Sequence, residues 1–178
     1  HGSTQSLVEE CIYFFTKAIW PNGEPSRSLI IGFSDFDATC VPSPRIIEAH
    51  SRCDSLSDLA TLLSVVRNAG QKYDFILIDL RRLVTDETTL SIYLAEYSDF
   101  VSRTLRQLLV PQRYCGLVVG TCEPGGGGFP LPWAVAVSTR KHLRLRDEKV
   151  GLVEGEGRIY YCLFMQAEDD KRPSDPLT

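Results

Sequence analysis

One run of residues has the composition of a strand that ends in a metal-holding carboxylate. Residues 73–79 read Tyr-Asp-Phe-Ile-Leu-Ile-Asp, an apolar segment with an acid at its carboxyl end. Ligands of open α/β sheets bind beyond the carboxyl ends of the strands, and an acid placed there can hold magnesium through water. Asp79 is therefore a candidate nucleotide-site residue. The alternative is that Asp79 only caps the loop that contains Arg81 and Arg82.

A phosphate-binding loop would need glycines and a lysine immediately before the first helix. The sequence at that place reads His-Gly-Ser-Thr-Gln, in which Gly2 and Thr4 fit the pattern and Ser3 stands where the lysine is expected. Without an ammonium group, phosphate binding is weak and phosphoryl transfer has no support. We therefore predict no catalytic residues and no competent ATP hydrolysis. No cofactor is expected, and weakly held ATP with magnesium is the alternative.

A glycine-rich loop followed by a basic strand is the second candidate site. Four glycines at 125–128 precede Phe129 and Trp133, and basic residues follow at 140, 141, 144 and 146. A basic strand face beside a loop with aromatic side chains suits contacts with single-stranded DNA. The alternative is a solvated edge strand that is protected by its charges. The candidate DNA-binding residues are Gly126, Gly127, Phe129, Arg140, Lys141 and Arg144.

The cysteines and histidines predict no metal site. None of the six cysteines forms a Cys-x-x-Cys pair, and the three histidines complete no zinc spacing. Cys11, Cys115 and Cys162 lie in apolar segments, where a thiol behaves as a small hydrophobic group. We expect reduced core cysteines in an intracellular protein rather than a disulfide framework.

Length and composition favour one globular domain. The chain has 178 residues, of which 43% are hydrophobic and 24% are charged, which is ordinary for a folded protein. We expect a domain over residues 1–166 and an acidic, proline-containing tail that frays over 167–178. The net charge of −4 does not attract nucleic acid, so DNA would have to bind the local basic strand. No membrane span and no signal peptide are expected.

Apolar spacing predicts an alternation of helices and strands. Strands that are separated by helices require right-handed crossovers, so the earlier strands should form a parallel sheet and the later ones an antiparallel extension. We expect helices over 6–19, 57–68 and 88–109, the last ended by Pro111; strands over 28–33, 73–80 and 115–120; a short apolar patch at 46–47; and later strands over 134–137, 141–146 and 159–165, with the charged segment 147–157 as a connection.

Residues 29–46 carry a resemblance to a known family. They read Leu-Ile-Ile-Gly-Phe-Ser-Asp-Phe and, further on, Pro-Ser-Pro-Arg-Ile, and this resembles the segment after the Walker A helix in Rad51-type recombinases. Asp35 is the nearest match to the acid that activates water in that family, although its spacing to Phe36 and Arg45 departs from the pattern. The strand that ends at Asp79 then falls at the Walker B position. Residues 115–120 fall where a strand leads into a mobile DNA-binding loop.

The resemblance implies a RecA-like α/β fold, with a mostly parallel central sheet flanked by helices and a C-terminal antiparallel extension. The resemblance also implies an ATPase-dead Rad51 paralog, whose degenerate nucleotide site would consist of Gly2, Thr4, Asp35 and Asp79. Such a subunit would act in homologous recombination and DNA repair in the nucleus, through a RecA-like partner and single-stranded DNA. The alternative is a P-loop nucleotide-binding protein of the ParA or tyrosine-kinase type whose Walker A motif is lost or truncated. A different enzyme on a Rossmann-like sheet has the least support, because no Gly-x-Gly-x-x-Gly follows a strand.

Overall fold

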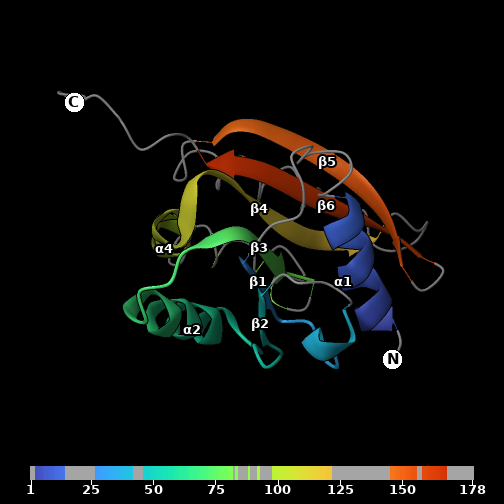
Figure 1. Cartoon of the computed structure of the whole chain (residues 1–178), viewed down its shortest axis with the longest axis horizontal. Helices are drawn as coiled ribbons and strands as arrows, with labels where there is room; N and C mark the ends of the chain where they lie inside the picture. The colour runs from blue at the N-terminus through green and yellow to red at the C-terminus, as the bar shows by residue number, and fades with distance from the viewer. Residues whose placement is uncertain are drawn as a thin grey trace.

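The computed structural model describes residues 3–14, 27–41, 46–81, 83, 88, 92, 98–121, 145–155 and 158–167. Within them, six strands form one sheet in the order β2-β1-β3-β4-β6-β5 (Figure 1). The strands are β1 (Arg27–Ile31), β2 (Ile46–His50), β3 (Tyr73–Asp79), β4 (Leu109–Thr121), β5 (Leu145–Gly155) and β6 (Arg158–Ala167). The helices are α1 (Ser3–Phe14), α2 (Leu56–Asn68), α4 (Ser98–Leu108) and the 3-10 turn η2 (Ala38–Cys40).

The sheet is parallel over its first four strands and antiparallel at one end. β1 pairs in parallel with β2 and with β3, and β3 pairs in parallel with β4. β6 pairs antiparallel with both β4 and β5, and lies between them. The expected α/β fold, with a mostly parallel sheet and a C-terminal antiparallel extension, is therefore confirmed.

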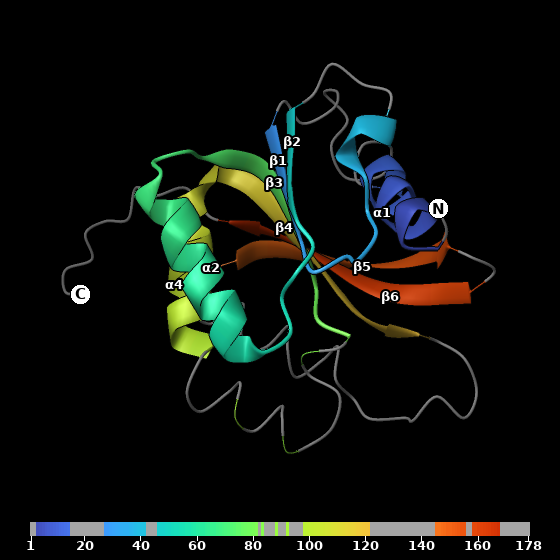
Figure 2. The same cartoon turned by 90° about the horizontal axis from the view of Figure 1, so that it is seen from below.

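The two faces of the sheet are covered by different helices. Figure 2 shows α1 and η2 on one side of the sheet, and α2 and α4 on the other. For η2, α2 and α4, which lie in connections between parallel strands, this division follows from right-handed crossovers. The chain moves from β1 outward to β2, and then back past β1 to β3. Because the direction reverses, the connection from β1 to β2 and the connection from β2 to β3 must lie on opposite faces of the sheet.

Apolar residues of α1 form one half of the core. Four apolar residues of α1 recur at helical spacing: Leu7, Val8, Cys11 and Ile12. They pack against the sheet at Ile30, Phe75 and Leu77. Strand residues alternate between the two faces, so Leu29, Ile31, Ile76 and Ile78 point toward the α2 side. All of these residues are buried. The expectation that Cys11 is a core thiol is confirmed.

The helix α2 begins and ends at residues with clear local roles. The Ser55 hydroxyl accepts a hydrogen bond from the Asp58 amide at 3.0 Å, and the Asp58 carboxylate accepts one from the Asp54 amide at 3.1 Å. This reciprocal pair satisfies amides that the first turn leaves without partners. The helix ends before Gly70, whose φ of 83° is a conformation that glycine adopts without strain.

Three expected elements differ from the observed ones. The patch at 46–47 is part of a full strand, β2, at the edge of the sheet. Pro111 does not mark the end of a helix but lies inside β4, where the register between β3 and β4 shifts and the hydrogen-bond ladder is interrupted. Most of the segment 147–157 is strand β5 rather than a connection.

Candidate functional site

The carboxyl ends of β1 and β3 lie at the point where the strand order reverses. The chain leaves β1 toward β2 on one side and returns to β3 on the other. The loops that follow β1 and β3 therefore diverge, and in open α/β sheets such a point is where ligands bind. Gly32 is the first residue after β1, and Asp79 is the last residue of β3.

Gly32 brings these two strand ends into direct contact. Its φ is 87°, and its amide donates to the main-chain oxygen of His50, at the end of β2, over 2.8 Å. A Cβ atom built at this position would lie 3.3 Å from the main-chain oxygen of Asp79 and 3.5 Å from its Cβ. Both the backbone angle and the crowding favour glycine. The loop after β1 is therefore turned sharply against the end of β3.

The next residues alternate between the core and the solvent. Phe33 and Phe36 are buried, and the Phe36 amide donates to the Phe33 carbonyl at 3.3 Å. Ser34 and Asp35, between them, are exposed. Asp35 has a φ of 64°, a left-handed conformation in which aspartate is enriched among residues other than glycine. The turn therefore presents a carboxylate beside the strand ends.

Asp79 is held by Arg81. Asp79 Oδ1 accepts hydrogen bonds from the Arg81 amide and from Arg81 Nε, both at 2.9 Å, and Oδ2 accepts one from Arg81 Nη2 at 2.7 Å. The Asp79 side chain is 4% exposed and the Arg81 side chain is 26% exposed. The interpretation of Asp79 as an acid that caps the following loop is confirmed. A magnesium ion would have to displace the guanidinium, and no cluster of three metal-binding side chains occurs among the described residues.

A second polar cluster joins β2 and β3. The Tyr73 hydroxyl donates to Glu48 Oε1, and His50 Nε2 lies 2.7 Å from Glu48 Oε2. Burial, and then the hydrogen bond to Glu48, raise the pKa of Tyr73 well above its usual value near 10. Partial burial favours a higher pKa for Glu48, but the hydrogen bonds from Tyr73 and His50 outweigh it and lower that pKa. Glu48 is therefore an ionised carboxylate between two polar partners.

The structure describes only part of the expected sites. Thr4 lies in α1, Asp35 in the loop after β1 and Asp79 at the end of β3. Gly2 lies outside the described residues, as do the expected DNA-binding residues Gly126, Gly127, Phe129, Arg140, Lys141 and Arg144. The expectations of a partner subunit and of a nuclear location rest on the sequence alone. None of the described helices has both the length and the apolar character needed to cross a bilayer.

Two contributors to the site were missed from the sequence. Gly32 ends an apolar run, and a glycine in that place is a signal of a tight turn that could have been recognised. Gln5 lies on α1 and bonds the loop after β1 across 32 positions of the chain. No local pattern announces a contact of that range.

Comparison with known proteins identifies the fold. No family model matches the sequence, and no curated protein matches it either. The structure is similar to a release factor-specific protein-(glutamine-N5) methyltransferase from Alicyclobacillus acidocaldarius, with a TM-score of 0.51, 19% identity, and coverage of 93% of this chain and 91% of that one. It is similar to the N-methyltransferase NodS from Bradyrhizobium japonicum, with a TM-score of 0.50, 11% identity, and coverage of 92% and 97%. The chain has the fold of these methyltransferases.

A third similar structure is longer than this chain. It is an N-methyltransferase from Haemonchus contortus in complex with phosphomonomethylethanolamine and S-adenosylhomocysteine, with a TM-score of 0.54 and 11% identity. The match covers 97% of this chain but 40% of that one. The chain therefore corresponds to less than half of that methyltransferase.

These similarities correct the family and the function expected from the sequence. The chain resembles methyltransferases and not RecA or Rad51 ATPases, so the RecA-like assignment is wrong. The prediction of an ATPase-dead Rad51 paralog in recombination and DNA repair is wrong with it, and the P-loop alternative is not supported. The resemblance to recombinases lay in the order and spacing of elements, and many α/β folds share an alternation of helices and strands.

Proposed function

We propose that this chain binds S-adenosylmethionine (SAM) and acts as a SAM-dependent methyltransferase domain. The observation that carries the proposal is the turn at Gly32, which sits at the reversal of strand order on a methyltransferase fold. When bound, SAM supplies an electrophilic methyl group to a nucleophilic atom of an acceptor molecule.

SAM and ATP differ in the charged groups that a binding site must hold. SAM has no phosphate, so it needs no phosphate-binding lysine, and its single anionic group is the methionine carboxylate. It carries a sulfonium and an ammonium group, both of which are cationic. The exposed Asp35 carboxylate lies beside the strand ends and suits these charges. The residues present at this edge therefore fit SAM better than they fit ATP.

Each strand end has a separate task in the proposed site. Gly32 keeps the loop after β1 close to β3 without a side chain in the way. The Asp79–Arg81 pair fixes the loop after β3, and the partly buried pair largely balances its own charge. Glu48 and His50 lie on β2, the neighbouring strand, where an acid binds ribose hydroxyls in related dinucleotide-binding sheets. Glu48 already bonds Tyr73, at the amino end of β3, so we assign the ribose of SAM to the end of β2 at His50.

Calorimetric titration with S-adenosylhomocysteine (SAH), the demethylated product, tests the proposal directly. The wild-type chain should bind SAM and SAH and should not bind ATP with magnesium. Asp35→Asn keeps a residue that tolerates positive φ and removes only the charge. It should weaken SAM binding by up to about fivefold, the effect of losing one exposed charge pair.

Asp74→Asn is the matched control for the loss of a carboxylate. Asp74 lies at the opposite, amino end of β3, where it accepts a hydrogen bond from the Arg27 amide at 3.3 Å, and asparagine can also accept that bond. Its SAM affinity should equal that of the wild type. A wild-type chain that takes up ATP with magnesium but neither SAM nor SAH would refute the proposal.

A further inference from the structure

A glutamine on α1 forms a two-point hydrogen bond with the loop after β1. Gln5 Oε1 accepts from the Asp37 amide at 2.8 Å, and Gln5 Nε2 donates to the Asp37 carbonyl at 3.2 Å. Nε2 also lies 2.8 Å from Glu9 Oε2, one turn further along the same helix. Gln5 is 7% exposed. A nearly buried carboxamide therefore recognises both main-chain groups of a single loop residue.

Asp37 is the residue on which the end of this loop is built. Its carboxylate accepts from the Thr39 amide at 3.0 Å and from the Thr39 hydroxyl at 2.6 Å, and so caps η2. Asp37 is two residues beyond Asp35 and five beyond Gly32. The contact with Gln5 thus fixes the loop after the exposed Asp35, whereas Gly32 fixes it before Asp35.

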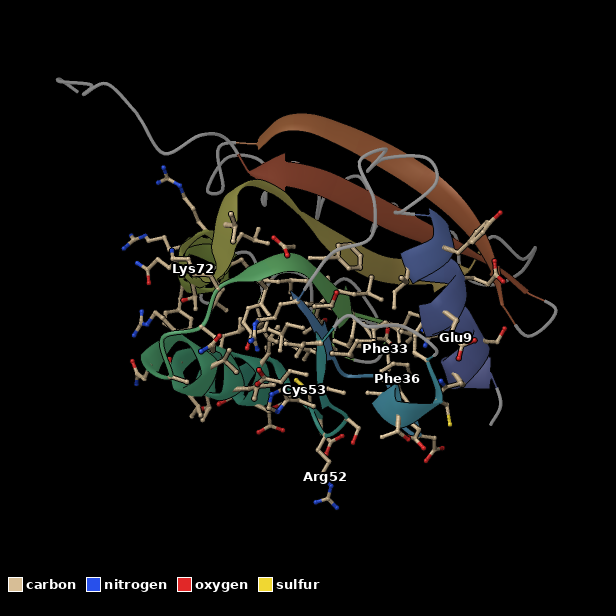
Figure 3. All side chains as sticks on the ribbon, in the orientation of Figure 1. Glu9, Phe33, Phe36, Arg52, Cys53 and Lys72 are labelled. Carbon is tan, nitrogen blue, oxygen red and sulfur yellow. The ribbon has the colours of Figure 1, made fainter. Side chains whose placement is uncertain are left out.

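Apolar contacts attach the same loop to the same helix. Phe33 and Phe36 belong to the cluster that contains Leu7, Val8, Cys11 and Ile12 of α1. Figure 3 shows Phe33 and Phe36 beside α1, the helix that carries Glu9. The loop from Gly32 to η2 is thereby held at three points, two apolar and one polar, and all three lie against α1.

We propose that Gln5 is a positioning residue, through which α1 holds the loop after β1 in the conformation that receives the cofactor. This inference rests on the proposed SAM-binding function. Ordering a loop residue costs backbone conformational entropy. If α1 orders the loop when the protein folds, this entropy loss does not reduce the affinity for the cofactor. The apparent dissociation constant of a site is its intrinsic value divided by the fraction of molecules that are competent to bind.

The first variant removes both hydrogen bonds at nearly constant side-chain volume. Gln5→Leu should weaken SAH binding about tenfold, as expected if the competent loop falls to about one tenth of the population. Hydrogen exchange of the Asp37 amide should also accelerate, because the acceptor that protects this amide is lost. Because Asp37 is exposed, water can satisfy its freed main-chain groups, so the urea midpoint should change little. Gln71→Leu, at an exposed glutamine before β3, is the control and should alter none of these readouts.

A second variant keeps the shape of the side chain and tests the donor alone. Gln5→Glu still offers an acceptor to the Asp37 amide, but at neutral pH it has no donor for the Asp37 carbonyl. Burial and the nearby Glu9 carboxylate raise the pKa of the introduced carboxyl, so it regains a proton as the pH falls from about 7.5 to about 5. SAH affinity should recover over that range, relative to the wild type at each pH. Among the described side chains, the other titratable groups at this contact are Glu9, Asp37 and Cys40.

The outcomes separate this inference from the function on which it rests. A wild-type chain that does not bind SAH would overturn both. Wild-type SAH binding, together with unchanged affinity and unchanged Asp37 exchange in Gln5→Leu, would overturn the role of Gln5 alone. A Gln5→Glu affinity that stays low at about pH 5, while the wild type still binds, would also overturn it.

Discussion

Two glycines share a backbone conformation but differ in their surroundings. Gly32 has a φ of 87° and Gly70 has a φ of 83°. A Cβ at Gly32 would meet the main chain of Asp79 at 3.3 Å, whereas a Cβ at Gly70 would meet nothing within 4 Å. The pair therefore separates the strain of a positive φ from the effect of crowding at the proposed site.

Alanine at these two positions should have unequal effects. Gly70→Ala should lower the free energy of unfolding by about 1 kcal/mol, the strain of a left-handed residue. Gly32→Ala should lower it by about 2 kcal/mol, because the end of β3 must also move. Urea denaturation measures both values. Equal losses of unfolding free energy in the two variants would show that the end of β3 at Asp79 moves without a free-energy penalty.

At the same scale, the sequence located Asp79 but could not choose its partner. An apolar strand that ends in an acid predicts a carboxylate at the carboxyl edge of a sheet, and this was right. Whether that carboxylate holds a metal or a neighbouring side chain depends on where Arg81 points. The structure places three Arg81 donors on Asp79. Side-chain direction after a strand end is set by packing, which the local sequence does not record.

At the scale of elements, the start of α2 depends on one hydroxyl. Ser55→Ala removes the acceptor for the Asp58 amide and should lower the free energy of unfolding by about 1 kcal/mol. Ser57→Ala, at an exposed position inside the helix, is the control and should change stability by less than about 0.5 kcal/mol. Urea midpoints compare the two variants. A larger loss in Ser57→Ala than in Ser55→Ala would contradict the assigned cap.

The elements that were predicted well are those with a continuous apolar signal. The helix expected over 57–68 and the strand expected over 73–80 agree with α2 and β3 to within one residue at each end. The sequence of β5 predicts a connection because it is charged and contains glycine. It lies at the edge of the sheet, where charged residues are common because they discourage pairing with other chains. β2, the other edge strand, carried only a short apolar signal for the same reason.

At the scale of the whole molecule, stability should fall in acid through Glu48. Its folded-state pKa is lowered by Tyr73 and His50, against the effect of burial. The unfolded chain therefore binds protons more readily, and the stabilisation is present above the usual glutamate pKa and lost as pH falls below about 4. Glu48→Gln should lower the urea midpoint at neutral pH. The difference from the wild type should shrink as the pH falls below about 4.

Glu10→Gln provides the control for this titration. Glu10 is an exposed carboxylate on α1, and its loss should leave the urea midpoint close to that of the wild type at every pH. A gap between the wild type and Glu48→Gln that stays constant from neutral pH to about pH 3 would contradict the assigned role of Glu48.

The family could not be read from the alternation of helices and strands. That alternation predicts parallel strands, but it does not say in which order they lie or where the order reverses. Here the reversal between β1 and β3, and the insertion of β6 between β4 and β5, define the sheet. Both depend on contacts between segments that are far apart in the chain, such as Val118 with Cys162.

The position of β6 also constrains how the protein emerges from the ribosome. Among the described strands, β5 pairs only with β6, and β6 is made after it. Residues 145–155 must therefore leave the exit tunnel before their partner strand exists. They remain unpaired in the sheet until residues 158–167 insert beside β4. The helix α1 is made before all six described strands. It lies against β5 (Figure 1) and gains that neighbour only at the same late step. Until then the edge of β4 stays open, so translation pauses before residue 158 expose a strand that other chains can join.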